Sequence, residues 1–341
     1  MAYVERGRNV SLPSKSDSSP RGSFIELRGS IVDVGILRDT LLPTFALHSG
    51  LSLVAWTIGR STDDFEVKDW LWPSSHLVNA WWASIGRRIV FGKLSPVQAL
   101  GSLSRPEYLL LGGVTIWASR QLFVLASRRR PRDNKSIVYD RDKFWVDALY
   151  DVFLPRAAIQ TVVTLPLTAP FYHQGGVFTG YHPWIQALSI AVFGTGLALQ
   201  SFADSQLDRY NQSSIKDAQV NKEGVWSVVR HPGSLGDFLI HASFPILLFS
   251  SDMLAPIELL GPLANYFFLQ YISTNSRTES QQAITYSKEK QAAFEAYRAD
   301  QDVNSFWPSL KQFGNPWLWK CVGLGVAFAA VEQVVHQLGL D

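Results

Sequence analysis

Long apolar runs alternate with polar, charged segments over most of this chain. Eight runs approach the roughly 20 apolar residues that a helix needs to cross a bilayer. They cover residues 41–58, 76–91, 108–126, 152–171, 184–202, 238–254, 257–272 and 317–335. The run at 76–91 fits least well, because it contains Asn79, Arg87 and Arg88. Since lipid admits only backbones that satisfy their own hydrogen bonds, the pattern predicts an all-α, polytopic membrane bundle of about seven or eight spanning helices, without a sheet.

Composition supports a membrane domain and bounds the rest of the chain. Of the 341 residues, 47% are hydrophobic and 18% are charged, and the net charge is only +2. Because the basic residues are scattered, we expect no nucleic-acid partner. Residues 1–35 are polar and lack an apolar core, which predicts a flexible tail without a cleavable signal peptide. The membrane-embedded domain is therefore expected over residues 36–341. The single cysteine, Cys321, excludes an intrachain disulfide and a cysteine metal site, and we expect no metal.

Loop lengths and charges predict the orientation. Three long polar segments, near 127–149, 203–235 and 274–314, alternate with short connections that carry almost no Lys or Arg. If each intervening run crosses the membrane, the three long loops lie on one side. Their excess of Lys and Arg indicates the cytosolic side. We expect an integral membrane protein, with the endoplasmic reticulum as its location.

The densest set of polar and glycine residues lies between two apolar runs, at 203–237. Arg230-His231-Pro232 is followed by Gly236 and Asp237. Proline is suited to the first turn of a helix, so a helix is expected to begin near Gly233. Unpaired N–H groups at a helix start bind anions, and a guanidinium adds a permanent charge. The segment fits either an anion-binding helix start or a plain helix boundary with an arginine at the lipid headgroups.

Two further clusters lie at the polar ends of apolar runs. Asp204 and Gln206 end the run at 184–202, where a carboxylate and an amide suit ribose hydroxyls or another amide. Glu279 follows the run at 257–272, and Tyr297 belongs to a later aromatic and cationic segment. Each cluster is equally typical of a solvated helix end or a helix on the membrane surface.

The order of these pieces resembles the steroid 5α-reductase-like superfamily, in particular its uncharacterised membrane branch, a domain of unknown function. That branch shows A-D-x-Q, then G-L-W-x-x-S-R-H-P-N-Y-F-G-E, a later Glu and a closing Y-x-x-Y and F-I-P. The matching residues here are Ala203-Asp204-Ser205-Gln206, Gly224-Val225-Trp226, Arg230-His231-Pro232, Gly236-Asp237, Glu279, Tyr297 and Phe306-Trp307-Pro308. Upstream, Trp117-Ala118-Ser119-Arg120 is similar to the branch's W-G-x-R. The resemblance covers about residues 66–310.

The resemblance implies a helical bundle with a nicotinamide cofactor site that faces the cytosol. Steroid 5α-reductases transfer hydride from NADPH to a conjugated C=C bond of a hydrophobic substrate. On this basis the cofactor-binding residues are expected to be Asp204, Gln206, Arg230, His231, Gly236, Asp237, Glu279 and Tyr297. Asp204, Arg230, His231, Asp237 and Glu279 are expected to converge at one cavity. The catalytic acid is not identified by any motif, and a steroid, isoprenoid or acyl substrate fits equally well.

The chain departs from the branch at one informative place. Gly233-Ser234 stands where the branch has Asn-Tyr, and that Asn belongs to the cofactor site of steroid reductases. Two other functions therefore stay open. The R-H-P-x-x-x-G core is shared with isoprenylcysteine carboxyl methyltransferases, which use S-adenosylmethionine. A non-catalytic membrane relative is the third alternative, and the sequence does not define the oligomeric state.

Overall fold

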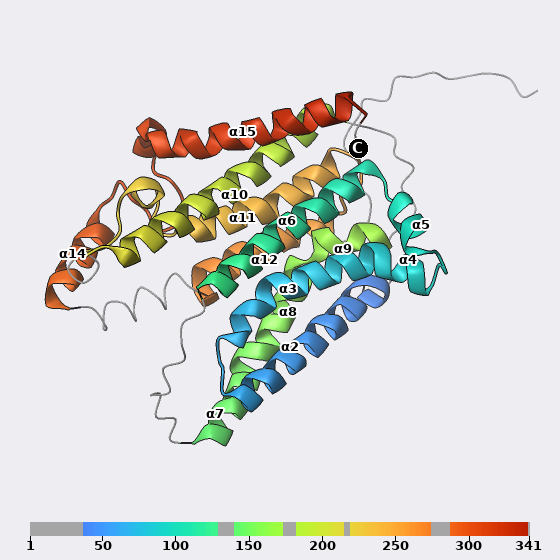
Figure 1. Ribbon diagram of the computed structural model, residues 1–341, viewed down its shortest axis with the longest axis horizontal. Coiled ribbons are helices and arrows are strands. Elements are labelled where there is room, and N and C mark those ends of the chain that lie inside the picture. The colour runs from blue at the N-terminus through green and yellow to red at the C-terminus, as the bar shows by residue number, and fades with distance from the viewer. Residues whose placement is uncertain (1–36, 129–139, 173–181, 215–218, 274–286, 340–341) are drawn as a thin grey trace, which may run out of the picture.

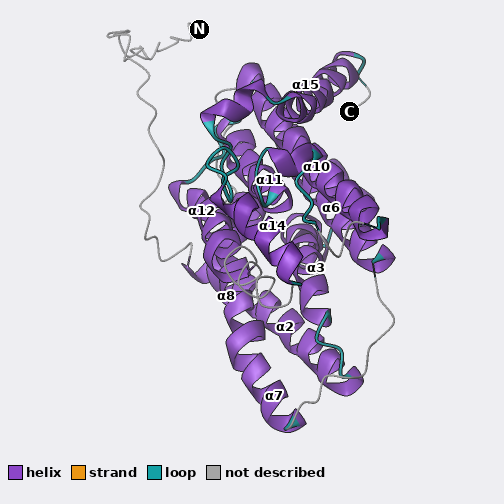
Figure 2. Cartoon of the chain, turned by 90° about the vertical axis from the view of Figure 1, so that its left-hand side faces the viewer, coloured by secondary structure: helices purple, strands orange, loops and turns teal. Residues whose placement is uncertain are grey.

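The computed structural model describes residues 37–128, 140–172, 182–214, 219–273 and 287–339. The predicted tail, residues 1–35, and Glu279 lie outside these ranges. Within them the chain forms helices and loops, and no strand is present in these parts of the chain (Figure 2). The elements are η1 Leu37–Leu41, α2 Leu42–Thr62, α3 Val67–Trp81, η2 Trp82–Gly86, α4 Arg87–Val90, α5 Pro96–Gly101, α6 Arg105–Ser127, α7 Arg141–Ala148, η3 Leu149–Phe153, α8 Leu154–Val163, α9 Leu165–Tyr172, α10 Pro183–Gln212, η4 Gly224–Ser227, α11 Pro232–Phe249, η5 Pro256–Leu259, α12 Leu260–Phe267, η6 Phe268–Ser273, α14 Lys288–Ala299, η7 Leu310–Gly314 and α15 Pro316–Gln337. The all-α prediction is confirmed.

Five of the described helices are long and apolar enough to cross a membrane. They are Leu37–Thr62, Arg105–Ser127, Pro183–Gln212, Pro232–Phe249 and Pro316–Gln337. The helices at 141–163 and 165–172 pass the same test together but are bent by 58° at Thr164, which gives a sixth candidate span. The described part of the chain thus supports an integral membrane protein with five or six candidate spans, compared with the predicted seven or eight.

The two remaining predicted spans are helical but do not meet that test. The stretch from α3 to α4 carries Lys68, Asp69, Arg87 and Arg88, and charged side chains are unfavourable in the hydrocarbon core. The stretch at 256–273 is divided among η5, α12 and η6, so no single helix in it reaches a spanning length.

Helices α10, α11 and α15 pack through glycines, and Figure 1 shows them side by side. A Cβ on Gly196 would lie 2.6 Å from the carbonyl oxygen of Gly236, and one on Gly325 would lie 2.2 Å from the carbonyl oxygen of Ala191. Backbones this close leave room only for hydrogen at the α-carbon. The glycine contact, as we call Gly196, Gly236 and Gly325 with their neighbours, therefore fixes α10 against both partners. This agrees with the packing role expected of glycine in a membrane helix.

The described parts of the loops at 203–235 and 274–314 lie at one end of the bundle, drawn at the left in Figure 1 beside α14. Arg128 at the end of α6 pairs with Asp208 near the end of α10 at 2.9 Å. The backbone N–H groups of Arg230 and His231 donate to the carbonyl oxygens of Asn304 and Ser305 at 2.9 and 3.1 Å. The described parts of these loops therefore share one side, as the alternation of runs predicts. We call this side the loop end.

Candidate functional site

A cavity of about 230 Å³ opens at the loop end, between α3, α6, α8, α10, α11 and η6. Helix ends bring polar side chains to its wall, because α6 and α10 end here while α3 and α11 begin here. Its lining residues are Asp69, Trp72, Gln121, Arg156, Gln200, Asp204, Gly233, Ser234, Asp237, Phe268 and Leu269. Three carboxylates and one guanidinium therefore face a space bounded by aromatic side chains.

Asp237 is the most deeply buried carboxylate of the wall, with 5% of its surface exposed. Trp117 Nε1 donates to its Oδ1 at 3.1 Å, and Gln200 Nε2 donates to the same oxygen at 3.2 Å. Asn265 Nδ2 donates to Oδ2 at 3.3 Å. These donors come from α6, α10 and α12, so the packing of three helices fixes the direction of one carboxylate. Such an oriented group is suited to binding a donor in the cavity.

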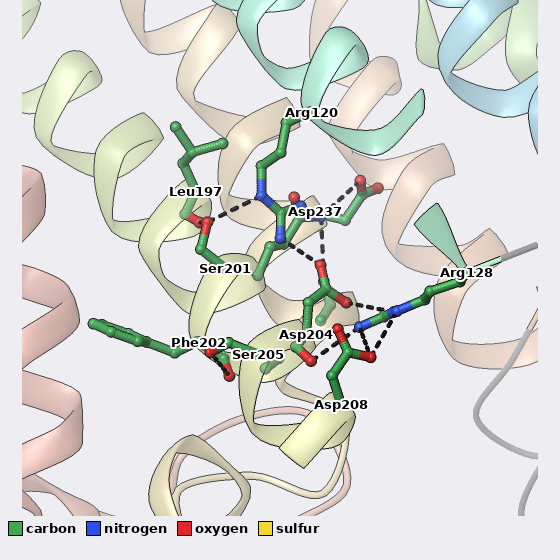
Figure 3. A network of polar contacts seen from close by, with 12 residues as sticks. Arg120, Arg128, Leu197, Ser201, Phe202, Asp204, Ser205, Asp208 and Asp237 are labelled. Atoms are coloured by element: carbon green, nitrogen blue, oxygen red, sulfur yellow. Dashed lines mark hydrogen bonds and ion pairs between the residues drawn. The ribbon is translucent and has the colours of Figure 1, made fainter. Parts of the chain in front are cut away.

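Asp204 lies in a network of charges at the end of α10, which Figure 3 shows. Arg120 binds its Oδ2, and Arg128 Nη1 lies 2.9 Å from its Oδ1. Arg120 also donates through Nε to Ser201 Oγ at 3.0 Å, and Arg128 continues the network to Asp208. Since two guanidinium groups neutralise Asp204, this carboxylate joins α6 to α10 and also contributes to the cavity wall.

The aromatic part of the wall comes from two distant elements. The rings of Trp72 and Phe268 stack with centroids 4.6 Å apart and an interplanar angle of 9°. Beside them, Arg156 binds the carbonyl oxygen of Lys68 and lies 3.7 Å from Asp69. A flat aromatic surface next to hydrogen-bonding groups is typical of a site for a planar polar ring.

Gln200 is incompletely bonded. Its exposed fraction is 3%, its Nε2 binds Asp237, and its Oε1 has no hydrogen-bond partner among the described residues. A buried amide oxygen without a donor is unfavourable unless a ligand or water supplies one. The Asp237–Gln200 pair, as we call these two side chains, therefore lies in the cavity wall and includes a buried acceptor that lacks a donor.

Only some of the predicted cofactor residues line this cavity. Asp204 and Asp237 do, as does the start of α11 at Gly233 and Ser234. Arg230 is outside the lining and donates through Nη1 to the carbonyl oxygen of Val303 at 2.9 Å. His231 is also outside it and precedes the first residue of α11. The structure thus brings the two aspartates together and places Arg230 and His231 on the adjoining loop.

Gln206, Gly236 and Tyr297 support the surrounding structure. Gln206 Oε1 accepts from the Val225 backbone N–H at 2.9 Å and holds the turn at Gly224, whose φ of +66° favours glycine. Gly236 is part of the glycine contact, where a Cβ would lie 2.7 Å from the carbonyl oxygen of Gly196. The Tyr297 hydroxyl donates to the carbonyl oxygen of Trp226, which attaches α14 to the same turn. Glu279 lies outside the described residues.

Several residues that line the cavity or hold its wall in place were not predicted. Trp117 and Arg120 belong to the upstream W-x-x-R match, and each binds one of the two aspartates. Gln200 and Arg156 are polar residues inside apolar helices, a pattern that marks functional positions in membrane proteins. That pattern could have identified them, but helix packing decides that both side chains line the same cavity. In the described part of the chain, no group of three or more His, Cys, Asp or Glu is arranged to hold a metal ion.

Comparison with known protein families gives one match that covers most of the chain. Residues 55–301 match the model of a family described as "Protein of unknown function (DUF1295)". None of the curated proteins and none of the solved structures matches the chain. The matched stretch covers most of the chain and includes every residue that lines the cavity. The chain therefore belongs to the DUF1295 family.

Proposed function

We propose that the protein is a membrane-embedded reductase that uses NADPH to reduce a conjugated C=C bond of a hydrophobic substrate. The observation that carries the proposal is the Asp237–Gln200 pair next to the stacked rings of Trp72 and Phe268. A nicotinamide ring offers a flat face for the aromatic wall and a carboxamide NH₂ for the acceptors. The resemblance to steroid 5α-reductases supports the same assignment.

The size of the cavity limits what it holds. About 230 Å³ is below the roughly 300–1,000 Å³ of ordinary small-molecule pockets, so the cavity suits the nicotinamide end of the cofactor alone. Carboxylates in the wall disfavour phosphates inside it. The phosphates then lie outside, toward the loop that carries Arg230, and Arg156 is the nearest guanidinium in the wall itself. The loop end is the cytosolic side in this proposal, in the membrane of the endoplasmic reticulum.

Binding of both nucleotides to purified protein tests the proposal. Wild-type protein in lipid nanodiscs is titrated with NADPH and with S-adenosylmethionine. Asp237→Asn replaces a charged acceptor with a neutral amide, which removes a charge-assisted hydrogen bond of about 1.5–3 kcal/mol. NADPH affinity is expected to fall about tenfold to a hundredfold. Asp208→Asn is the control, since Asp208 is also a hydrogen-bonded carboxylate but does not line the cavity.

Arg230→Ala tests where the phosphates bind. The side chain contributes a permanent charge, so its loss is expected to weaken NADPH binding by about tenfold or more. NADH, which lacks the 2′-phosphate, separates loss of a diphosphate contact from loss of the 2′-phosphate contact. Failure of wild-type protein to bind NADPH would refute the proposal.

A methyltransferase is the second candidate, and one observation favours it. Three carboxylates, Asp69, Asp204 and Asp237, line the cavity, and they suit the ammonium group of S-adenosylmethionine. Binding of S-adenosylmethionine without NADPH would support this candidate. Binding of neither would favour a non-catalytic member of the family.

A further inference from the structure

Three histidines lie together in the interior behind the cavity wall. His48 on α2 and His76 on α3 are fully buried, and His241 on α11 is 2% exposed. The ring centroids of His76 and His241 are 5.3 Å apart, and those of His48 and His76 are 6.1 Å apart. Imidazoles are rare in such an environment and usually mark a functional path in membrane proteins.

Backbone contacts fix the protons of two of these rings. His76 Nδ1 lies 2.7 Å from the carbonyl oxygen of Trp72, and His241 Nδ1 lies 2.9 Å from that of Asp237. A carbonyl oxygen only accepts, so in both rings Nδ1 carries the hydrogen. Each Nε2 then bears a lone pair, and neither Nε2 has a hydrogen-bond partner among the described residues.

His48 also has one ring nitrogen that donates and one whose lone pair has no partner, but here Nε2 is the donor. Its Nε2 lies 3.1 Å from Thr164 Oγ1, and that hydroxyl donates its own hydrogen to the carbonyl oxygen of Gln160 at 2.8 Å. His48 Nε2 is therefore the donor, and Nδ1 bears a lone pair that has no partner in the described part of the chain. All three imidazoles thus hold a ring nitrogen whose lone pair has no partner among the described residues.

We propose that His48, His76 and His241 form a buried proton-transfer chain that ends at Asp237 in the cavity wall. His241 takes a proton at Nε2 and releases the one at Nδ1 to Asp237, whose Oδ2 lies 3.5 Å from Nδ1. His76 takes and gives the proton at Nε2, with a water as the bridge at these ring separations. His48 is the far end of the chain.

The side of α2 that carries His48 extends the polar path. Thr40, Thr44 and Ser52 are spaced four residues apart around His48, and each is fully buried. The hydroxyl oxygens of Thr40 and Ser52 lack a partner in the described residues. Charged side chains of the surrounding helices lie in or beside the cavity wall at Asp69, Arg120, Arg156 and Asp204. At the His48 end, the guanidinium of Arg87 lies over the ring of Tyr172, and Glu258 is buried on η5.

A metal centre is not favoured at this place. In the part of the chain that the structure describes, these histidines and Asp237 do not form a group arranged to hold a metal ion. The lone pairs instead require hydrogen-bond donors, which protons and water supply.

The proton-transfer chain has a defined role in the proposed reduction, and that role rests on the proposed function. Hydride from NADPH adds to one carbon of the C=C bond and leaves NADP⁺, and the other carbon takes one proton. In this scheme His241 passes the proton through Asp237 to the substrate carbon, so Asp237 carries the proton only during the transfer and is otherwise an acceptor. His76 then restores the proton to His241. His241 and His76 are positioning residues that act through Asp237.

Nitrogen-15 NMR of histidine-labelled protein in bilayers tests the proton-transfer chain without any enzyme assay. We expect His76 and His241 to be protonated at Nδ1 and unprotonated at Nε2 in the resting protein. His76→Gln and Asp237→Asn should each change the ring-nitrogen signals of His241, because each variant alters a neighbour on the proton path. Ser243→Ala is the control, since Ser243 is buried on the same helix and bonds only within it. Unchanged His241 signals in both variants would overturn the proton-transfer chain.

Turnover tests the role in the reaction. His241→Phe is expected to lower kcat by about 10²–10⁴, the usual contribution of a proton-transfer group, and to increase the solvent deuterium isotope effect while NADPH affinity is retained. A merely structural role would reduce NADPH binding and kcat together. Wild-type kcat in His241→Phe would overturn the role. If wild-type protein does not reduce its substrate, the proposed reduction fails. The NMR result then tests the proton-transfer chain by itself.

Discussion

Two regions of the α10–α11 pair use apolar helices in opposite ways. At the glycine contact, Gly196 and Gly236 bring the two backbones together until no side chain fits between them. One turn earlier on α11, a Cβ at Gly233 would meet no atom within 4 Å, and the helices instead border the cavity. Gly236 therefore allows close helix packing, and Gly233, three positions earlier, leaves space at the cavity. The difference shows that close contact and open space are built into the same helix.

The comparison extends to polar groups. Behind the glycine contact, Asp237 is bound by donors from three helices. Between α2, α3 and α8, by contrast, several buried polar atoms lack partners among the described residues, including both amide atoms of Asn79. Satisfied groups stabilise one packing, whereas unsatisfied groups are costly and indicate a requirement for water, protons or ligand.

The largest effect is expected at the glycine contact. Gly196→Leu inserts a side chain where a Cβ already lies 2.6 Å from the carbonyl oxygen of Gly236. The free energy of unfolding should fall by about 3 kcal/mol. Gly112→Leu on α6 is the control, because a Cβ there meets nothing within 4 Å. Unfolding by dodecyl sulfate measures both variants, and equal stability would contradict the packing role.

A somewhat smaller loss is expected in the charge network beside the cavity. Arg120→Ala removes a 17% exposed guanidinium from Asp204 and Ser201. We expect about 1.5–3 kcal/mol of stability to be lost, since hydrogen bonds to a charged group are involved. Arg128→Ala removes a side chain that is 33% exposed, so its effect should be smaller. The same unfolding assay ranks the two, and the reverse order would show that Arg128 is the main partner of Asp204.

Two buried asparagines separate an amide that donates to Asp237 from an amide that has no partner among the described residues. Asn265→Leu deprives Asp237 of a donor and should destabilise the protein by about 1–3 kcal/mol. Asn79→Leu removes an amide without partners and should be neutral or stabilising. Thermal unfolding in detergent compares the pair. A loss of stability in Asn79→Leu would indicate that water or a ligand binds its amide.

The smallest effect is expected at Gly233. Gly233→Asn restores the residue of the resembled branch at a position where the structure has room for it. One neutral hydrogen bond contributes about 0.5–1.5 kcal/mol, so NADPH affinity should rise about twofold to tenfold. Gly236→Asn, three residues along, should instead destabilise the protein. If Gly233→Asn leaves NADPH affinity unchanged, this position does not contact the cofactor.

The apolar runs, the loop charges and the order of polar motifs determined much of this protein. They identified a helical membrane domain, a helix that begins at Pro232, and one shared end for the long loops at 203–235 and 274–314. They also identified Asp204 and Asp237, which do line one cavity. These features are local, since helix formation and burial in lipid depend on nearby residues.

Tertiary structure alone decided which polar residues meet. Gln206 and Tyr297 hold the turn at Gly224, and Gly236 contacts α10, although their motifs suggested a cofactor site. Gln200, Arg156 and Trp72 enter the cavity from three separate helices, and His48, His76 and His241 meet across nearly 200 residues of sequence. A helix presents every side to some neighbour, and the sequence does not specify which neighbour lies there. That choice depends on how closely each pair of helices approaches, which glycines such as Gly196 set through contacts far apart in the chain.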